Sequence, residues 1–480
     1  MPASDPQIGP LPLLEWSALQ PRLDPTTAES LGRVVDAIRA AGGRPHLAGG
    51  AVRDLLLGLT PGDFDIEVFG LAAAGLENAL RRVFPVDTVG RSFAVFKIRG
   101  QPIDVGLPRR EVKTGQGHRD FAVEGDPEMS LEEAAARRDF TVNALLYAFG
   151  EGRFLDPLKR GWADLQAGRL HPCSDRFAED PLRVLRGMQL AARFRLDPTD
   201  EAIALSRTLT PEGLPAERLW EEWRKLLVLG ERPSIGLRFL RDAGWLTFFP
   251  ELEALVGCEQ DPEWHPEGDV WTHTLHCLDA FAAQRSSDPD EDFIVGLAVL
   301  CHDFGKPATT SADEASGHIR SLGHEEAGVE PTRQFLTRLT RQEKLIEAVL
   351  PLVRHHLKPA LLYRDQSGPA AIRRLARKVG RIDRLCRVAR ADYAGRPPLP
   401  GTPANHVDWL WQQAGELEVE KARPEPLIKG RHLLQRGWQP GPALGKALDQ
   451  IFEAQLDGAF STEAEGLEWL DQQGDGFDPE

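Results

Sequence analysis

The residues best suited to chemistry in the first part of the chain are closely spaced aspartates. In "HLAGGAVRDLLLGLTPGDFDIEVFG", residues 46–70, Asp63 and Asp65 are two positions apart on a segment that reads as a strand. Alternate residues of a strand point to one face, so the two carboxylates lie about 6 to 7 Å apart. Such a pair favours Mg²⁺, which binds carboxylates together with phosphate oxygens and water. Asp104 in "PIDVG" could add a third carboxylate from a neighbouring strand, although solvated surface acids remain the alternative.

Two glycines precede the aspartates at a predicted strand-to-helix turn. Gly49 and Gly50 would let backbone N–H groups approach a triphosphate, and the following helix would point its positive end there. Divalent ions next to backbone N–H groups that bind phosphate are typical of enzymes of phosphoryl or nucleotidyl transfer.

A second group of residues has the chemistry to read a nucleotide base. "AEDPLRVLRGMQ" places Glu179 and Asp180 at a helix start, with Arg183 one turn later. An Asp acceptor beside an Arg donor matches the edge of cytosine or adenine and mismatches uracil and guanine. The alternative is an ordinary acidic first turn with an i, i+3 ion pair.

Just ahead of another predicted helix, "RRDFTVNALLY" supplies two cations and an acid. Arg137 and Arg138 could hold phosphate, and Asp139 could accept from a ribose hydroxyl. An N-capped helix with surface arginines is compatible with the same residues.

A third group combines histidines with aspartates in the second half of the chain. His302 and Asp303 are adjacent in "VLCHDFGKP", His273 precedes them and Asp392 follows them. Such a set can hold Mn²⁺, Ni²⁺ or Fe²⁺, or else Mg²⁺. Three further histidines could add metal ligands or bind phosphate, namely His324, His355 and His356. Lys306 could also bind phosphate.

Composition limits the classes of function. The 480 residues carry a net charge of −16 and are 41% hydrophobic, which indicates a folded multidomain protein and argues against a general polyanion-coating role. Five dispersed cysteines predict reduced thiols in a cytoplasmic protein. The densest apolar run, 293–301, is too short to span a bilayer, so no membrane association is expected. Nothing indicates an oligomeric state.

The elements that position these residues divide into two classes. Segments 44–50, 63–70 and the hairpin over 92–107 predict strands, with helices over 27–43, 51–58 and 75–84, which indicates a small mixed sheet with helices on one side. From about residue 130 the patterns are almost wholly helical. The stretch 372–392 reads as one helix with eight basic residues on its outer face, which predicts a solvated face or, alternatively, an RNA backbone contact.

The motifs of the first half together resemble the class II tRNA nucleotidyltransferase and bacterial poly(A) polymerase family. "GGAVRD…GDFDIE", "RRDFTVNA", "DPLKRGWADLQAGRLH" and "EDPLRVLR" occur in the family's order, over about residues 44–230. The resemblance implies a template-independent enzyme that adds C, C and A to the tRNA 3′ end from CTP and ATP with Mg²⁺. It implies metal ligands at Asp63 and Asp65, contacts of Arg137, Arg138 and Asp139 with ribose and phosphates, base reading by Asp180 with Arg183, and a mobile loop at 108–130. With the residues proposed above, the expected catalytic set is Asp63, Asp65 and Asp104, and the expected nucleotide-binding set is Gly49, Gly50, Arg53, Arg137, Arg138, Asp139, Glu179, Asp180, Arg183 and Arg186.

Other residues gain roles from the same resemblance. Glu179 would orient Arg183 during base reading, and Asp156, Gly161 and Asp164 would form a hinge between head and neck. The C-terminal segment also resembles the end of this family, and its Trp438 is more typical of a core residue than of a stacking platform.

The order H…HD…D over 265–395 resembles the HD superfamily of metal-dependent phosphohydrolases. The four ligands it implies are His273, His302, Asp303 and Asp392. The resemblance implies phosphatase or 2′,3′-cyclic phosphodiesterase activity.

We therefore expect an α+β protein: a polymerase-β-like nucleotidyltransferase head with a mixed sheet, followed by all-α neck, HD and tail domains. The expected boundaries are a loose arm over 1–25, the head over 26–168, the neck over 169–260, the HD domain over 261–395 and the tail over 406–480. The alternatives are a poly(A) polymerase, or a CC-only or A-only enzyme whose HD half binds without hydrolysis.

Overall fold

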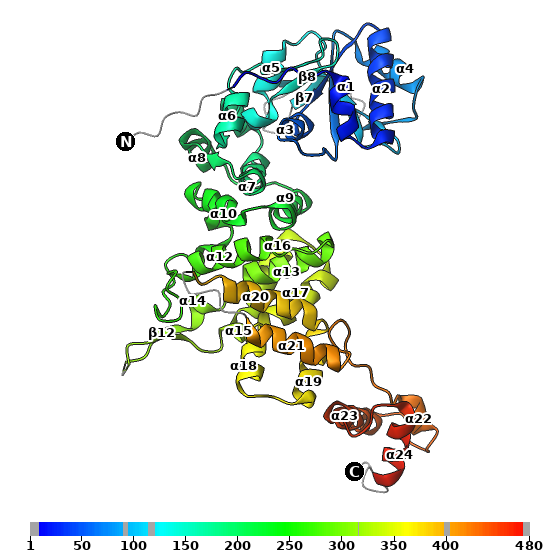
Figure 1. Ribbon diagram of the computed structural model, residues 1–480, viewed down its shortest axis with the longest axis vertical. Coiled ribbons are helices and arrows are strands. Elements are labelled where there is room, and N and C mark those ends of the chain that lie inside the picture. Colours follow the sequence, from blue (N-terminus) through cyan, green and yellow to red (C-terminus); the bar gives the residue numbers. More distant parts are fainter. Residues whose placement is uncertain (1–8, 90–94, 114–120, 315, 398–403, 474–480) are drawn as a thin grey trace. The chain divides into compact units, whose positions relative to one another are not determined.

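The computed structural model describes residues 9–89, 95–113, 121–314, 316–397 and 404–473 (Figure 1). The chain forms two compact units. Unit 1 contains residues 1–214 and 242–244, and unit 2 contains residues 215–241 and 245–480.

Unit 1 is built on a seven-stranded mixed sheet. The strand order is β3-β4-β5-β2-β1-β8-β9, and β2 and β5 pair in parallel while their neighbours pair antiparallel. The strands span Val86–Val89 (β3), Val95–Ile98 (β4), Ile103–Gly106 (β5), Phe64–Phe69 (β2), Arg44–Ala48 (β1), Leu146–Ala148 (β8) and Arg153–Leu155 (β9). The expected mixed sheet is confirmed, including the antiparallel pair of β4 and β5.

Helices cover the sheet, as the sequence pattern predicts. Helices α2 (Pro25–Ala40) and α4 (Ala73–Arg81) pack side by side, and they contact β1 and β3 respectively (Figure 1). A short helix, α3 (Gly50–Leu56), follows β1 directly. The apolar side chains of β2 alternate with polar ones, because Phe64, Ile66 and Val68 are buried while Asp65 is exposed. This alternation leaves a polar face on β2.

Strands β8 and β9 were missed by the sequence analysis, which expected almost only helices after residue 130. Leu146, Tyr147 and Ala148 are all buried. A short strand that is buried on both faces has no two-residue alternation, so its sequence cannot be told from a buried helical segment.

The remainder of unit 1 is mainly helical. It contains α5 (Leu131–Ala136), η2 (Thr141–Asn143), α6 (Gly161–Ala167), η3 (Asp175–Glu179), α7 (Leu182–Phe194) and α8 (Asp200–Arg207), with a strand pair β10 (Arg169–Leu170) and β11 (Asp197–Pro198). The expected mobile loop, 108–130, contains the antiparallel strands β6 (Arg109–Lys113) and β7 (Phe121–Gly125). Its residues 114–120 lie outside the described residues.

Unit 2 is a helical bundle with one short antiparallel pair, β12 (Thr310–Ala312) and β13 (Ile319–Ser321). Helices α12 (Val270–Ala282), α13 (Pro289–Cys301) and α20 (Ile382–Ala394) pack against one another, and α17 (Glu343–His355) packs on α13. These four helices carry or directly precede most of the predicted histidine and aspartate ligands. Other helices surround them, namely α9 (Ala216–Leu229), α10 (Pro233–Asp242), α15 (His324–Ala327), α16 (Val329–Leu339), α18 (Lys358–Arg364), α19 (Pro369–Val379) and α21 (Asn405–Glu416).

The basic stretch 372–392 forms two helices, so the expectation of one continuous helix is wrong. Gly380, with a φ of +75°, separates α19 from α20, and this left-handed conformation favours glycine over other residues. Six of the eight cations pair with carboxylates: Arg374, Arg377, Arg381, Arg384, Arg387 and Arg390. Their partners come from α13, α20, α21 and the tail, so these cations join helices and have less capacity for RNA phosphates.

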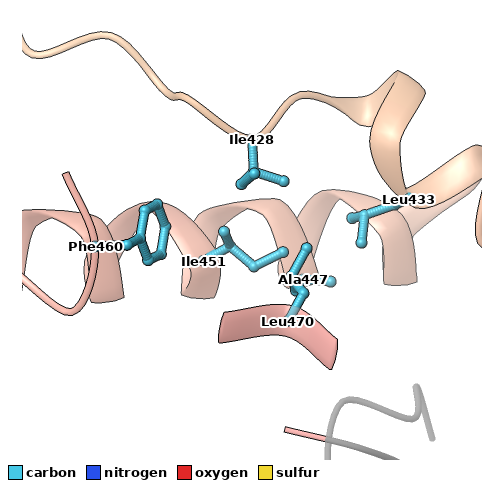
Figure 2. Close-up of a cluster of buried hydrophobic side chains, with 6 residues drawn as sticks. All are labelled: Ile428, Leu433, Ala447, Ile451, Phe460 and Leu470. Carbon is cyan, nitrogen blue, oxygen red and sulfur yellow. The ribbon is translucent and has the colours of Figure 1, made fainter. Parts of the chain in front are cut away.

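The tail has its own apolar core. Helices α22 (Gly430–Leu434), α23 (Pro442–Asp457) and α24 (Glu463–Gln473) enclose the buried residues that Figure 2 shows: Ile428, Leu433, Ala447, Ile451, Phe460 and Leu470. Trp438 packs against this cluster, which confirms its interpretation as a core residue. Helix α21, which follows the predicted linker, packs on α18 and α20.

All five cysteines are free thiols. Among the described helices, none combines the length and apolar character needed to cross a bilayer.

Candidate active sites

The three predicted carboxylates of unit 1 lie together where two central strands of the sheet, β2 and β5, begin. Asp65 on β2 lies opposite Asp104 on the parallel strand β5, and Asp63 directly precedes β2. Gly49 adopts a φ of +74°, and a Cβ at this position would approach the Asp65 Oδ2 to 3.2 Å. Glycine at position 49 therefore keeps a close space open beside the carboxylate. We call Asp63, Asp65 and Asp104 the carboxylate edge.

A pocket of about 440 Å³ opens beside this edge. Its lining is rich in charged residues and includes Asp65, Glu67, Asp104, Arg109, Arg137, Arg138, Glu179 and Arg183. We call Arg137, Arg138 and Arg183 the arginine wall. The structure thus brings carboxylates and cations that are up to 118 positions apart in the sequence to one pocket.

The charges at the edge perturb one another. The pKa of Asp65 is raised, because the surrounding protein removes part of its solvation even though the side chain keeps an exposed face. The charge of Arg138 opposes this rise, and those of Asp104 and Asp63 add to it. Asp104 pairs with Lys97 of β4 at 2.9 Å, a neighbour that the sequence analysis missed. A carboxylate with raised pKa among like charges is suited to a bound cation.

Arg138 is fixed in the wall by a carboxylate. Its Nη2 lies 3.1 Å from Glu67 Oε2, while its buried Nε makes no hydrogen bond among the described residues. Arg183 is fixed differently, since its guanidinium donates to the backbone carbonyls of Arg176 and Arg137, both at 2.6 Å. Both cations are therefore held in position before any ligand arrives.

The predicted base-reading residues divide between the pocket and its border. Glu179 and Arg183 line the pocket, whereas the Asp180 Oδ1 accepts a hydrogen bond from the Leu182 N–H. Asp180 therefore binds the first backbone N–H of α7, three positions before Arg183. The expected role of Glu179 in orienting Arg183 stays a prediction, because the Arg183 guanidinium donates to the backbone carbonyls of Arg176 and Arg137.

Asp139 lies behind the pocket as the centre of a buried network. It is 6% exposed, pairs with Arg186 at 2.7 Å and accepts hydrogen bonds from Asn143 and from the Phe140 N–H. Burial alone would raise its pKa, but the Arg186 charge and these hydrogen bonds outweigh burial and lower the pKa to about 2. Asp139 and Arg186 thus link the start of η2 to α7.

The low pKa of Asp139 predicts a contribution to acid stability. The folded state holds the ionised form, so the stabilisation is complete above the unfolded pKa and is lost as the pH falls towards about 2. Between pH 6 and pH 3 the wild type should lose about 1 kcal/mol more than Asp139→Asn. Hydrogen exchange of peptides spanning β1 and β8, corrected for intrinsic rates at each pH, measures this difference. Equal losses in both proteins would contradict it.

Arg53 is placed as a structural link rather than on the pocket surface. It is 4% exposed, its Nη1 donates to the Asn143 Oδ1 at 2.6 Å, and it pairs with Asp54. Its guanidinium also lies 4.0 Å from the ring centre of Phe194 at the end of α7. Its nucleotide-binding role stays a prediction, and the contacts support an indirect one through Asn143 and Asp139.

Residues of the "DPLKRGWADLQAGRLH" motif connect α6 to neighbouring segments of unit 1. Asp164 accepts from the Thr141 hydroxyl at 2.7 Å, and Asp156 accepts from the Trp162 N–H at 3.0 Å. Gly161 lies so close to the Thr141 carbonyl that a Cβ would be 2.5 Å from it. These contacts make a packed junction, and its expected role as a hinge stays a prediction.

The second site lies in unit 2, where six predicted ligands converge. We call them the histidine cluster: His273, His302, Asp303, His324, His356 and Asp392. His273 Nε2 lies 3.1 Å from Asp392 Oδ1, and Asp303 lies 3.2 Å from His302 Nε2 and 3.3 Å from His324 Nε2. His324 and His356 approach to 3.2 Å between their Nε2 atoms.

Every histidine of the cluster is oriented by a hydrogen bond from its other ring nitrogen. In three of them the Nδ1 atom lies 2.7 Å from a backbone carbonyl, namely in His302, His324 and His356. Because a carbonyl can only accept a hydrogen bond, Nδ1 is the donor in each case. His273 Nδ1 lies 2.7 Å from the carboxylate of Glu267. Hydrogen bonds from His265 and His273 lower the pKa of Glu267 to about 2 although its burial opposes this. The Nε2 atoms are therefore free to coordinate a metal ion.

Two buried polar atoms of the cluster are incompletely satisfied. His302 Nε2 and Asp303 Oδ2 are inaccessible and lie 3.2 Å apart without a well-aligned hydrogen bond among the described residues, and the Asp303 oxygen is paired with Lys306 Nζ at 2.8 Å. Such atoms are costly in a protein interior unless something binds them. The histidine cluster is therefore compatible with a metal site, and its N and O donors fit a divalent transition metal.

A pocket of about 240 Å³ gives access to this cluster. It is lined by Asp303, His324, His356 and Asp392 together with the cations Lys306 and Arg396. Lys306 Nζ lies 2.8 Å from Asp303, and the buried Nε of Arg396 makes no hydrogen bond among the described residues. Arg396 was missed by the sequence analysis, although it follows Asp392 by one helical turn.

His355 is the one suggested ligand that the structure places apart. It belongs to none of the ligand groups among the described residues. Burial and the charges of Lys378, Lys358 and Arg354 lower its pKa to about 4. Its neighbour His356 points into the cluster instead, because adjacent helical residues face different directions.

Comparison with known proteins finds a domain match for each of the two regions that contain these sites. Residues 45–171 match the poly A polymerase head domain, and residues 270–388 match the HD domain. A multifunctional CCA protein of Xanthomonas oryzae pv. oryzae is 35% identical over 433 residues, which cover 87% of this chain and 99% of that protein. The chain belongs to the multifunctional CCA protein family. Another member, from Halorhodospira halophila, is 39% identical and covers 84% of this chain and 94% of its own length.

The fold of the chain is also that of solved class II CCA-adding enzymes. The Bacillus stearothermophilus CCA-adding enzyme, solved in complex with CTP, aligns over 94% of this chain and 98% of its own, with a TM-score of 0.65 and 22% identity. The expected head with a mixed sheet, followed by a largely helical remainder, is confirmed.

Proposed function

We propose that the pocket between the carboxylate edge and the arginine wall is where this CCA tRNA nucleotidyltransferase joins CTP and ATP to the tRNA 3′ end. The activity follows from the family, and relatives solved with CTP, with ATP and with tRNA support these substrates. The observation that carries the assignment is the register of Asp65 against Asp104 on parallel strands, at the mouth of an arginine-lined pocket.

Asp63, Asp65 and Asp104 would hold Mg²⁺ in this site. Their hard oxygen donors fit this ion, and the glycine at position 49 leaves room beside Asp65. When bound, Mg²⁺ would neutralise charge on the phosphate groups that react. Lys97 would release Asp104 for this role, since their exposed ion pair is weak in water.

The arginine wall would bind and orient the triphosphate. Arg138 is held by Glu67, and Arg137 lines the same pocket, so both can offer donors to phosphate oxygens. Asp139 and Arg186 would support the wall from behind, because their ion pair fixes the segment that follows Arg138. Positioning of this kind supplies much of the catalysis in nucleotidyl transfer.

Base selection would rest on Arg183 with Asp180. We expect Arg183→Ala to raise UTP incorporation relative to CTP by about 10-fold or more, because one well-placed donor pair contributes about 1 to 3 kcal/mol of discrimination. Affinity for the triphosphate should change less. Arg176→Ala is the matched control, since that side chain is exposed while its carbonyl, which holds Arg183, is retained. Unchanged selectivity in Arg183→Ala would contradict the base-reading role, and steady-state incorporation assays measure it.

The number of nucleotides added is tested directly by sequencing products. tRNAs ending before CCA, before the second C and before A are each incubated with CTP, ATP and Mg²⁺. A CCA-adding enzyme completes all three, whereas a CC-only enzyme adds only the missing C residues to the first two and an A-only enzyme extends only the third. A poly(A) polymerase would instead extend unrelated RNA with long A tails.

We infer that the histidine cluster holds Mn²⁺, Ni²⁺ or Fe²⁺, or else Mg²⁺, and acts on phosphate esters at RNA ends. When bound, the ion would supply a nucleophilic water and polarise the phosphoryl group. Lys306 and Arg396 would bind the phosphate oxygens, because they are the cations of the pocket and Arg396 has an unpartnered Nε. A 2′-phosphate or 2′,3′-cyclic phosphate is the substrate class that suits an enzyme of tRNA 3′ ends. The free thiols support the proposal that the protein works in the reducing cytoplasm.

A further inference from the structure

A cysteine lies inside the histidine cluster. Cys277 follows His273 by one turn of α12 and is completely buried. Its Sγ lies 3.3 Å from His273 Nε2 and 3.9 Å from the backbone carbonyl of Asp392. One ligand atom from each of His273, Cys277, His302 and Asp392 lies within 4.8 Å of the others.

An independent observation indicates that a ligand is needed at this point. His302 Nε2 reaches the same group of atoms, is on a side chain only 1% exposed, and lies 3.2 Å from Asp303 Oδ2 without forming a well-aligned hydrogen bond among the described residues. A protonated His273 could satisfy Glu267 and Asp392 without any ion, but it would leave His302 Nε2 without a well-aligned hydrogen bond. An ion shared by the four side chains accounts for all of them.

The spacing of the donor atoms suits such an ion. Tetrahedral N and S ligands at about 2.0 to 2.3 Å from a metal lie about 3.4 to 3.6 Å from one another. The distances of 3.3 Å between Cys277 Sγ and His273 Nε2 and of 3.1 Å between His273 Nε2 and Asp392 Oδ1 are close to these values. These two pairs would need little rearrangement for coordination, and His302 Nε2, which lies within 4.8 Å of the other donors, would move closer to them.

A glycine provides the space that the sulfur occupies. A Cβ at Gly395 would overlap Cys277 Sγ. The φ of Gly395 is −74°, which any residue adopts, so its backbone conformation does not require glycine. The close contact with the Cys277 sulfur is what disfavours a larger side chain at position 395.

We propose that Cys277 is a thiolate ligand of the metal in the histidine cluster, together with His273, His302 and Asp392. The inference rests on the proposed metal site and adds a soft donor to it. Soft thiolate and imidazole ligands favour Zn²⁺, Co²⁺ and similar ions over Mg²⁺. On binding, the thiol proton leaves to solvent and the sulfur donates an electron pair to the ion. Asp303, His324 and His356 form the adjoining half of the cluster.

Cobalt absorption of the full chain tests this ligand. The metal-free protein is titrated with Co²⁺ while its near-ultraviolet absorption is recorded, because thiolate coordination gives an intense charge-transfer band there that N and O ligands lack. We expect the band in the wild type and in Cys386→Ala, and its loss in Cys277→Ser. Cys386 is the matched control, since it is a buried thiol on α20 that lies outside the ligand groups. Cys277→Ser should also lower the affinity for Zn²⁺ about 10-fold or more and change that for Mg²⁺ less.

The outcomes separate this inference from the proposed function. Co²⁺ bound by the wild type without the band would overturn the Cys277 assignment and leave the metal site intact. Failure of His302→Asn to reduce Co²⁺ binding would overturn the metal site itself. The wild-type spectrum decides the question even if a cysteine variant folds poorly.

Discussion

Nucleotide addition should fall on the order of a thousand-fold when Asp65 is replaced by asparagine, while phosphate release by the HD domain stays unchanged. Asn keeps the shape of the side chain but removes the charge from the carboxylate edge. Asp65 is the best-placed member, because it faces Asp104 across the parallel pair and touches the space kept open by Gly49. Divalent ions contribute several kcal/mol to phosphoryl and nucleotidyl transfer, and about 4 kcal/mol corresponds to such a loss.

The test uses tRNA lacking CCA and measures the initial rate of extension with CTP and Mg²⁺. Asp63→Asn should behave similarly, and Asp63→Ala combined with Asp65→Ala should abolish extension. Asp87→Asn is the matched control: Asp87 is an exposed aspartate on β3 of the same sheet, paired with Arg99. Extension by the double variant at a rate near that of the wild type would show that the metal assignment is wrong.

Phosphate release should be lost, by on the order of a hundred-fold or more, when His302 is replaced by asparagine. His302 is almost fully buried, its Nδ1 is fixed by the Val299 carbonyl, and its Nε2 makes no well-aligned hydrogen bond among the described residues. Removing it takes one ligand from the histidine cluster, and even residues that only support metal ligands affect metal sites by about 10- to 100-fold. Nucleotide addition should continue, because the carboxylate edge belongs to the other compact unit.

The measurement is release of inorganic phosphate from an RNA with a 2′-phosphate 3′ end, with each divalent metal in turn. His276→Asn is the matched control, since His276 lies on the cluster helix α12 but outside the ligand groups of the described residues. A chelator should stop wild-type release, and the fitting metal should restore it. If the wild type releases no phosphate with any metal while still binding one, the HD domain would be a binding module without turnover.

The two activities are thus expected to be separable by single substitutions. Each site draws its residues from one compact unit, and each has its own pocket. A variant that loses both activities would indicate general unfolding, so the second activity serves as a folding control for the first.

The sequence by itself determined the motifs and their chemistry. The i, i+2 spacing of Asp63 and Asp65, the H…HD…D order and the glycine pair are local patterns, and local patterns report which residues share one strand or helix. The helical periods of unit 2 and the alternation along β2 are local in the same sense, which is why most elements were predicted.

Only the tertiary structure decided which distant residues meet. The register of β2 against β5 placed Asp65 opposite Asp104, and packing of α12 against α20 placed Cys277, His273 and Asp392 together. Packing of α17 on α13 brought His356 into the cluster and left His355 outside it, and packing between helices paired the cations of 372–392 with acids from other helices. Such contacts depend on strand pairing and on side-chain packing between segments far apart in the chain, and a single sequence carries no direct record of either.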